Sequence, residues 1–440
     1  MRQKAVPFCR GGQETEMNYF GYKNGELYCE NVSVRAITEK TGTPVYIYSA
    51  KTLKRHYNVF KNAFVRTKPL ICYSVKANSN TAIVALFSSL GAGADIVSGG
   101  ELFRAVRAGI HGKKIVYSGV GKTLEEIIYA LTEDILMFNA ESIEELDAID
   151  EAAGLMGVKA PVSIRVNPDI NPHTHPYIST GMKKNKFGID IRYAREAYTI
   201  ARSKHHLQVV GVDMHIGSQL TGVSPVIDAL KRVQGLIKEI RKDGIDIRYM
   251  DIGGGLGITY KDERAASPDN YAGAIEKTLK DFDGRLILEP GRVLAGNAGI
   301  LAAKVLYRKD NGMKKFMIVD AGMNDLIRPS FYDAYHEILP VDETRSKLFK
   351  QDVVGPICES GDFFAHDRNL PLLEQGRAIA LMSAGAYGFS MSSNYNSRRR
   401  AAEVMVDDKE YYLIRKRETN NDLIKGERIP SFIKIRSNHV

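Results

Sequence analysis

The chain has 440 residues, of which 44% are hydrophobic and 26% are charged, and its 61 Lys and Arg residues against 52 Asp and Glu residues give a formal net charge of +9. This length is too great for one ordinary hydrophobic core and predicts two domains, or a barrel-sized domain with a smaller companion. The basic residues are spread among acidic ones, so the composition argues against nucleic-acid binding and suits small anionic ligands.

The first strand-like segment is the run GELYCENVSV at residues 25–34. It precedes a long region of alternating strands and helices, and the C-terminal part of the chain is again rich in strand patterns. We therefore expect this early run to join a β domain built mainly from the C-terminal part.

Residues 70–290 alternate short β-branched apolar runs with longer segments whose apolar residues recur every three or four positions. This alternation is typical of βα units around a parallel sheet. Eight strand-like runs favour an α/β fold of the closed, TIM-type (β/α)8 kind over an open doubly wound sheet. The runs are ICYSV at 71–75, ADIV at 94–97, KIVYS at 114–118, ILMF at 135–138, VSIRV at 162–166, VVGVDMH at 209–215, YMDI at 249–252 and LILE at 286–289.

After the eighth run the pattern changes to short alternating segments separated by turn signals. In KVLYRKDNGMKKFMIVDAG the pair Asn311-Gly312 predicts a hairpin turn. We expect a mostly antiparallel β domain of the sandwich or β-barrel kind. The predicted boundaries are residues 45–295 for the barrel, and residues 1–44 together with 296–440 for the β domain.

The cysteines Cys9, Cys29, Cys72 and Cys358 are far apart and form no CxxC pair. Their spacing indicates neither a zinc site nor a disulfide framework, and it is typical of a reducing compartment. The N-terminal stretch lacks the apolar run of a signal peptide, and no stretch of about 18 apolar residues is present to span a membrane. We expect a cytoplasmic protein without a membrane partner.

Polar residues or glycines follow all eight predicted strands. Barrel enzymes place their chemistry on the loops at the carboxyl ends of the strands. Any one of these residues alone reads as a solvated loop residue, but eight polar ends over eight apolar strands indicate a lined pocket. In chain order the ends are Lys76, Ser98, Ser118, Asn139, Asn167, His215, the glycine cluster at 253–257 and Glu289.

Lys76 ends the first predicted strand and precedes the polar turn from Asn78 to Asn80. In a pocket walled by apolar strands, desolvation would lower the pKa of this lysine and make its amine able to form a Schiff base. Taken alone, the lysine fits an aldolase, a pyridoxal-phosphate enzyme or a solvated surface charge.

The segment GGGLG follows the seventh strand, and EPGR follows the eighth. Bare backbone N–H groups let an anion approach closely, and barrels commonly hold a phosphate at these two strand ends. The spacing is not a dinucleotide fingerprint, because GxGxxG would need glycine at Ile258 or Tyr260. A lysine for a Schiff base together with a phosphate cradle indicates pyridoxal phosphate.

Two further strand ends fit this cofactor. Glu289 is the candidate partner of the ring nitrogen, where a carboxylate keeps the pyridinium protonated and increases its electron withdrawal. His215 can stack on the ring, although a lone histidine is otherwise read as a packing residue.

Eight segments of the chain resemble those of the diaminopimelate decarboxylases, in the same order. This family consists of fold-type III pyridoxal-phosphate enzymes with an alanine racemase-like barrel and a β domain. The resemblance runs from about residue 20 to the C-terminus, and the order of the eight segments makes it specific. The segments are CYSVKANSN, GADIVSGGEL, KFGI, HIGSQ, GGGLGITY, EPGR, GPICESGD and GAYGFSMSSNYNSR.

For the cofactor, the resemblance implies that Lys76 holds it covalently, that His215 stacks on its ring and that Glu289 pairs with its nitrogen. The phosphate would be bound by Ser218, by the glycines around Gly255 and by the EPGR backbone. The cofactor residues implied are Lys76, Asp95, His215, Ser218, Gly254, Gly255, Glu289, Gly291, Arg292 and Tyr387.

For the substrate, Arg292 and Arg328 resemble the residues that grip the distal carboxylate, as guanidinium groups do well. Tyr332 and Tyr387 would complete that pocket, and Glu359 would meet the distal ammonium group.

The resemblance implies that Cys358 donates the proton that replaces carbon dioxide, beside Lys76 and His215 as the other catalytic residues. It also implies a homodimer in which Cys358 and Glu359 come from the partner subunit.

The implied reaction converts meso-2,6-diaminopimelate to L-lysine and carbon dioxide, the last step of lysine biosynthesis. Decarboxylases of ornithine, arginine or carboxynorspermidine share the lysine and the HIGSQ-like and EPGR-like elements. The segment from Arg328 to Tyr332 together with CES favours diaminopimelate over these substrates. A non-catalytic pyridoxal-phosphate carrier is the alternative from another class, and the presence of Lys76, Cys358 and Glu359 argues against it. No metal site is expected.

Overall fold

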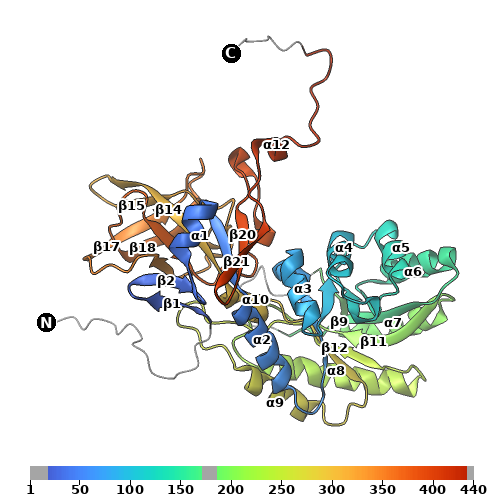
Figure 1. Cartoon of the computed structure of the whole chain (residues 1–440). Coiled ribbons are helices and arrows are strands. Elements are labelled where there is room, and N and C mark those ends of the chain that lie inside the picture. Colours follow the sequence, from blue (N-terminus) through green and yellow to red (C-terminus); the bar gives the residue numbers. More distant parts are fainter. Residues whose placement is uncertain (1–17, 171–185, 434–440) are drawn as a thin grey trace.

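The computed structural model describes residues 18–170 and 186–433, and the larger part of it is a closed barrel of parallel strands (Figure 1). The barrel closes because β8 pairs with β9, while β9 also pairs with β11 and with the short strand β10 (Ile189–Asp190). The predicted TIM-type barrel and its eight strands are confirmed. The strands are β5 (Leu70–Ser74), β6 (Gly93–Ile96), β7 (Ile115–Tyr117), β8 (Met137–Ala140), β9 (Ala160–Asn167), β11 (Leu207–Asp213), β12 (Tyr249–Asp251) and β13 (Arg285–Leu288).

Helices pack around the barrel in chain order, and all of those named below except α8 have a side-chain cap at the first turn. Asn80 accepts the N–H of Ala82 at the start of α3, and Thr123 and Glu126 form a capping box at the start of α5. Each helix turns an apolar face inward, as in α8, whose buried residues recur every three or four positions. The helices are α2 (Ala50–Ala63), α3 (Thr81–Ser89), α4 (Gly99–Arg107), α5 (Leu124–Thr132), α6 (Ile143–Met156), α7 (Ile191–Ser203), α8 (Ser224–Lys242) and α9 (Pro268–Thr278).

Inside the barrel, the side chains change from apolar to polar toward the carboxyl ends of the strands. Residues two positions apart in a strand point to the same face. On four strands a buried apolar residue is followed, two positions later, by a buried polar one. The barrel interior therefore has a layer of apolar side chains and, nearer the mouth, a layer of polar ones. The pairs are Cys72 and Ser74, Val116 and Ser118, Met137 and Asn139, and Ile287 and Glu289.

A nine-stranded sheet forms most of the remaining structure and is mostly antiparallel, with parallel pairs between β4 and β20 and between β15 and β17. The predicted hairpin joins β14 to β15, and Gly312 in its turn has a φ of 81°. The prediction of a mostly antiparallel β domain is confirmed. Its strands are β4 (Val45–Ser49), β14 (Gly299–Asp310), β15 (Lys315–Val319), β16 (Ile338–Pro340), β17 (Leu348–Val354), β18 (Phe363–Pro371), β19 (Ala378–Leu381), β20 (Ala402–Asp407) and β21 (Glu410–Arg415).

The N-terminal part of the chain packs against this β domain before the barrel begins. A small antiparallel sheet of β1 (Phe20–Lys23), β2 (Glu26–Cys29) and β3 (Val32–Ser33) precedes α1 (Val34–Thr41). The N–H of Leu27 donates to the carbonyl oxygen of Val341 at 2.8 Å. Strand β4 then lies between β14 and β20 in the nine-stranded sheet.

The pairing of β4 with β14 and β20 affects where the boundary between the two domains lies. The sequence prediction begins the barrel domain at residue 45, which includes β4 in it. Because β4 pairs with strands of the β domain, we propose that the barrel domain begins at residue 50, with α2, and ends at residue 295.

Short helices occur after the last barrel strand and within the β domain. They are α10 (Arg292–Ala295), α11 (Arg328–Tyr332) and α12 (Asn420–Leu423). Within the two described stretches, no helix combines the length and the apolar character needed to cross a bilayer.

Candidate active site

Lys76 lies in a 3-10 turn, Val75–Ala77, directly after β5. The polar residues behind it build the following turn, because Asn78 Oδ1 accepts the N–H of Asn80 and Asn80 caps α3. The side-chain amide of Asn78 also donates to the carbonyl oxygen of Gly385 at 3.2 Å. The Asn-Ser-Asn turn therefore fixes the backbone beyond Lys76 and ties the barrel mouth to the β domain.

The amine of Lys76 forms an ion pair with the carboxylate of Asp95, at the end of β6. Asp95 is fully buried and accepts a second hydrogen bond from Ser74 at 2.6 Å. Burial lowers the pKa of Lys76, but the carboxylates of Asp95 and Glu289 raise it, so the net pKa lies above the ordinary value for lysine. The prediction of a lowered pKa for Lys76 is therefore wrong in its net direction, because the neighbouring charges outweigh the effect of desolvation.

His215 lies beyond β11 beside the glycine turn. Its Nδ1 accepts the N–H of Gly254 at 3.2 Å, which places the ring proton on Nε2. Burial, together with the cations Arg165 and Lys76, lowers the pKa of His215 well below its ordinary value. The ring at this strand end is therefore a neutral imidazole.

The glycine turn after β12 leaves no room for side chains. A Cβ on Gly254 would lie 2.2 Å from the carbonyl oxygen of Glu289. Gly255 has a φ of 109°, and a Cβ there would lie 2.5 Å from the carbonyl oxygen of Gly217. A Cβ on Gly291 would lie 3.0 Å from side chains at and just beyond the end of β5. Glycine at these positions therefore lets the turns beyond the barrel strands pack closely against one another, at the two strand ends where the sequence predicts a phosphate cradle.

Two arginines are buried next to this turn. Arg292 begins α10 and is 7% exposed, and Arg328 begins α11 and is 5% exposed. Both contact Tyr260: Arg292 Nη1 donates to its hydroxyl at 2.7 Å, and the guanidinium carbon of Arg328 lies 4.7 Å from its ring centroid. The Nε of each arginine is buried without a hydrogen-bond partner within the described residues. Such unpaired cationic donors suit an anionic ligand.

Other predicted residues surround this arginine pair. Arg292 Nη2 donates to Ser218 Oγ at 3.1 Å, and its guanidinium carbon lies 4.8 Å from the ring of Tyr387. The N–H of Tyr387 donates to the carbonyl oxygen of Ala77 at 2.7 Å, next to Lys76. Burial raises the pKa of Tyr332 while the charges of Arg328 and Arg292 lower it, so Tyr332 lies within electrostatic range of both arginines.

Cys358 and Glu359 lie elsewhere, on an exposed loop of the β domain after β17. The N–H of Cys358 donates to Asn396 Oδ1 at 2.8 Å, and the hydroxyl of Tyr395 donates to Glu359 at 3.0 Å. Both bonds stay within the β domain. Within one chain, the structure does not bring these two residues into the group around Lys76.

Besides the buried acids Asp213 and Asp251, sequence reasoning missed Glu101, Tyr260 and His336. Glu101 lies in the first turn of α4, where burial raises its pKa to about 7 and Lys76 acts to lower it. His336 Nε2 lies 2.8 Å from Arg328 Nη1. The sequence gives a signal for Tyr260, which stands three residues beyond the glycine turn. It gives none for His336 or Glu101, because a lone histidine and an acid in a helix both have ordinary structural explanations.

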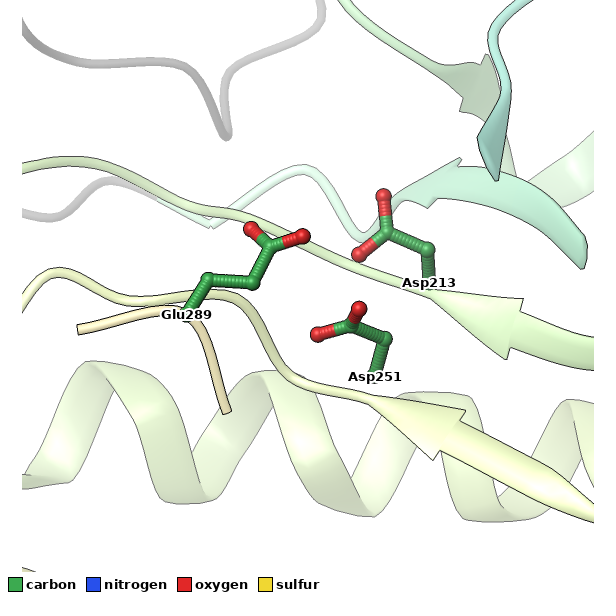
Figure 2. Close-up of side chains that lie close together, drawn as sticks. All are labelled: Asp213, Asp251 and Glu289. Atoms are coloured by element: carbon green, nitrogen blue, oxygen red, sulfur yellow. The ribbon is translucent and has the colours of Figure 1, made fainter. Parts of the chain in front are cut away.

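Asp213, Asp251 and Glu289 bring three carboxyl groups together under the mouth (Figure 2). A hydrogen-bond donor and a cation already serve this group: Asp251 accepts from the N–H of Gly253 at 3.0 Å, and Arg165 forms an ion pair with Asp213 at 3.8 Å. We therefore interpret the group as part of a hydrogen-bond network rather than as a metal site.

Comparison with known proteins places this site in a family. Residues 50–296 match the model of the pyridoxal-dependent decarboxylase family, pyridoxal binding domain. Diaminopimelate decarboxylase from Aquifex aeolicus is 50% identical over 408 residues, which cover 92% of this chain and 97% of that protein. The chain belongs to the diaminopimelate decarboxylase family. Diaminopimelate decarboxylase from Haemophilus influenzae is likewise 50% identical, over 92% of this chain and 98% of that protein.

Solved structures agree with this family. The diaminopimelate decarboxylase of Helicobacter pylori, complexed with L-lysine, aligns with a TM-score of 0.86 at 45% identity, over 89% of this chain and 98% of that one. A lysine/ornithine decarboxylase of Vibrio vulnificus, complexed with putrescine, shares the fold with a TM-score of 0.76 at 20% identity, over 85% of this chain and 97% of that one.

The residues at the barrel mouth fit pyridoxal phosphate, the cofactor of this family. Lys76 supplies an amine at the mouth, and the glycine turn after β12 packs its backbone directly against Glu289 and Gly217, at the strand end where a phosphate is predicted. The unpaired donors of the two arginines fit additional negative charge. The barrel therefore presents the chemical groups that a phosphorylated aldehyde requires.

Proposed function

We propose that this protein decarboxylates meso-2,6-diaminopimelate to L-lysine and carbon dioxide. The observation that carries the proposal is the pair of buried guanidinium groups, Arg292 and Arg328, close to Lys76. Diaminopimelate brings a second carboxylate that can meet them, whereas ornithine and arginine have none at their distal end. The names of the Aquifex and Haemophilus relatives agree with this substrate, and the Helicobacter structure contains the product that we propose.

Bound pyridoxal phosphate supplies the electron withdrawal that makes the carboxylate a leaving group. We assign its covalent attachment to Lys76, ring stacking to the neutral imidazole of His215, and the ring nitrogen to Glu289. Asp95 would hold the Lys76 side chain toward the mouth through their ion pair. The phosphate is assigned to Ser218 and to the backbone at Gly254, Gly255 and Gly291.

The substrate is assigned to the pocket beside the cofactor. Arg292 and Arg328 would bind its distal carboxylate, with Tyr332 and Tyr387 lining the pocket, and Glu359 would bind its distal ammonium group. These fixed charges orient the molecule so that its other carboxylate faces away from them.

The Cys358 thiol is assigned as the proton donor. When the carbon–carbon bond breaks, its electron pair stays with the substrate while carbon dioxide leaves. The proton of the Cys358 S–H bond then forms the new C–H bond on the carbon that carried the carboxylate, leaving a thiolate.

Because Cys358 and Glu359 lie on an exposed loop, we propose a homodimer in which this loop completes the partner's site. Lys76→Ala and Cys358→Ala subunits should each be inactive alone. After random exchange, half of the dimers would hold one intact site, and activity should return to about one quarter of the wild-type value. No recovery in confirmed mixed dimers would overturn the shared site and leave the substrate assignment standing.

We also propose that the protein acts in the cytoplasm on this small molecule. Cys29, Cys72 and Cys358 are free, as a reducing compartment favours, and Cys9 lies outside the described residues.

The deciding experiment is carbon dioxide release by the purified protein, with and without added cofactor, from diaminopimelate, ornithine, arginine and carboxynorspermidine in competition. We expect release that depends on the cofactor and favours diaminopimelate. Preference for ornithine would overturn the substrate assignment. A cofactor-loaded protein that releases no carbon dioxide would indicate a non-catalytic carrier.

A further inference from the structure

Three carboxyl groups are buried together under the barrel mouth: Asp213 at the end of β11, Asp251 at the end of β12, and Glu289 just after β13 (Figure 2). One oxygen from each lies within 4.8 Å of the other two, and the residues are 1%, 0% and 5% exposed. Like charges this close, and out of water, cannot all be ionised. We call this group the carboxyl trio, and it retains at least one proton at neutral pH.

The cations nearest to the carboxyl trio already have other partners. Lys76 is paired with Asp95. Arg165 donates to Glu141 at 2.6 Å, and its Nε is 3.8 Å from Asp213. Each of these two cations thus has a nearer carboxylate outside the trio, so together they offset only part of the negative charge of the trio.

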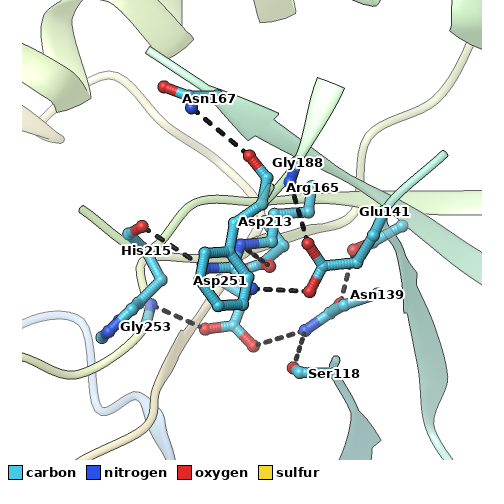
Figure 3. A network of polar contacts seen from close by, with 12 residues as sticks. Ser118, Asn139, Glu141, Arg165, Asn167, Gly188, Asp213, His215, Asp251 and Gly253 are labelled. Carbon is cyan, nitrogen blue, oxygen red and sulfur yellow. Dashed lines mark hydrogen bonds and ion pairs between the residues drawn. The ribbon is translucent and has the colours of Figure 1, made fainter. Parts of the chain in front are cut away.

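Hydrogen-bond donors decide which member of the trio is ionised. Asp251 accepts from the N–H of Gly253 at 3.0 Å and from Asn139 Nδ2 at 3.4 Å (Figure 3). Burial raises the pKa of Asp251 to about 6, and these donors together with Glu289 hold it down. Burial and the charge of Asp251 raise the pKa of Glu289 well above its ordinary value. Burial and the charge of Asp251 likewise raise the pKa of Asp213 well above its ordinary value. Asp251 is therefore the carboxylate, Glu289 and Asp213 are the acids, and neutral His215 adds no charge.

Asn139 connects these two residues. Its Oδ1 accepts from Ser163 at 2.6 Å, which turns its Nδ2 toward Ser118 Oγ at 3.0 Å and toward Asp251 (Figure 3). Ser118 Oγ in turn donates to Glu289 at 3.2 Å. One oriented amide thus reaches Asp251 directly and Glu289 through a hydroxyl.

We propose that Asp251 is a positioning residue that keeps a proton on Glu289, ready for the ring nitrogen of the cofactor. The inference rests on the proposed function, which assigns that nitrogen to Glu289. In the step, the O–H bond of the Glu289 carboxyl breaks and an N–H bond forms at the ring nitrogen, leaving a carboxylate beside a cation. The charge of Asp251 then stabilises that cation, which the electron withdrawal requires.

The first test uses the protein without cofactor. Infrared titration should show protonated carboxyl bands at neutral pH, one of which Glu289→Gln removes and which is therefore the Glu289 band. In Asp251→Asn this band should lose its proton at a pH at least one unit lower, because a neighbouring negative charge is gone. Asp283→Asn, which removes an exposed carboxylate on the outside of the barrel, is the control and should leave the titration unchanged. A band with the wild-type midpoint in Asp251→Asn would overturn the proposal.

The second test uses the holoenzyme loaded with pyridoxal phosphate labelled with ¹⁵N in the ring. Asp251→Asn should shift the ring nitrogen resonance toward the unprotonated form and lower kcat for diaminopimelate at least tenfold, with KM within twofold of wild type. Asp251→Glu should restore part of the ring nitrogen protonation and part of kcat. A fall in kcat with a fully protonated ring nitrogen would assign Asp251 a merely structural role.

A second variant covers failure of Asp251→Asn to fold. Asp251→Ser removes the same charge but keeps a hydroxyl that can accept the N–H of Gly253, and it should lower the Glu289 midpoint in the same direction. An unchanged midpoint there also counts against the proposal. Both infrared tests are independent of the substrate, so a failure of the proposed decarboxylation leaves their outcome readable.

Discussion

His336 Nε2 accepts a hydrogen bond from Arg328 Nη1 at 2.8 Å, while its Nδ1 donates to the carbonyl oxygen of Met382 at 2.8 Å. Arginine can only donate, so this geometry requires the neutral ring with its proton on Nδ1. Burial and the charge of Arg328 lower the pKa of His336 to about 3, which keeps the ring neutral. His336 thereby fixes the orientation of the Arg328 guanidinium group, which we assign to binding the distal carboxylate of the substrate.

We predict that His336→Phe raises KM for diaminopimelate about tenfold with a smaller change in kcat, because a hydrogen bond to a charged group contributes roughly 1.5–3 kcal/mol. Steady-state kinetics measure this split. His336→Gln, which retains an acceptor, should recover most of the affinity. Equal KM values in the wild type and in His336→Phe would show that Arg328 needs no such support.

Arg328→Met should weaken binding of L-lysine roughly 10–100-fold, since the distal carboxylate loses a charge-assisted partner. Binding of 1,5-diaminopentane, which has no carboxylate, should stay within twofold of wild type. Calorimetric titration of both ligands into the holoenzyme makes the comparison. If the affinities for both ligands fall equally, Arg328 does not bind the carboxylate.

The Cys358 thiol is exposed, whereas Cys29 and Cys72 are buried and burial raises the pKa of both thiols. We predict that iodoacetamide modifies Cys358 much faster than the other two, that the loss of activity follows this modification, and that saturating L-lysine slows it. Peptide mass mapping identifies the site. Cys358→Ala should keep the cofactor absorbance and lose most decarboxylation, and full activity in that variant would exclude the thiol as proton donor.

Asp95 raises the pKa of Lys76, so the amine is protonated at neutral pH and a larger neutral fraction appears only as the pH rises. Because only the neutral amine attacks a carbonyl carbon, capture of pyridoxal phosphate by the apoprotein should accelerate with pH. In Asp95→Asn that acceleration should move to lower pH. Stopped-flow absorbance measures it, with Asp147→Asn on the outer face of α6 as control. Superimposable profiles for Asp95→Asn and wild type would mean that Asp95 does not set this pKa.

The parts of the fold and site that follow from sequence have local signals. The barrel strands are short apolar runs between helical patterns, and Lys76 and the glycine turn each stand directly at a strand end. Because parallel strands bring their carboxyl ends together, this local information is enough to collect Lys76, His215 and Glu289 at one mouth.

The remaining features depend on contacts that sequence spacing does not reveal. The run VYIYS in β4 is fully buried like a barrel strand, and only its pairing partners assign it to the other sheet. The pKa of Lys76 depends on Asp95 from the neighbouring strand. Asp213 and Asp251 read as ordinary polar residues within apolar runs until the barrel closes and turns both toward Glu289.

The central position of β4 also limits how the protein can be divided. A fragment that begins after the barrel would carry the other strands of the nine-stranded sheet but would lack the strand between β14 and β20. Its sheet would be left with two open inner edges, which are sites of aggregation. During synthesis, the residues of β4 leave the ribosome before the barrel. They can pair with β14 only after more than 250 further residues have been made, since β14 begins at Gly299. The second domain is thus completed last, and its assembly draws together the two chain segments that flank the barrel.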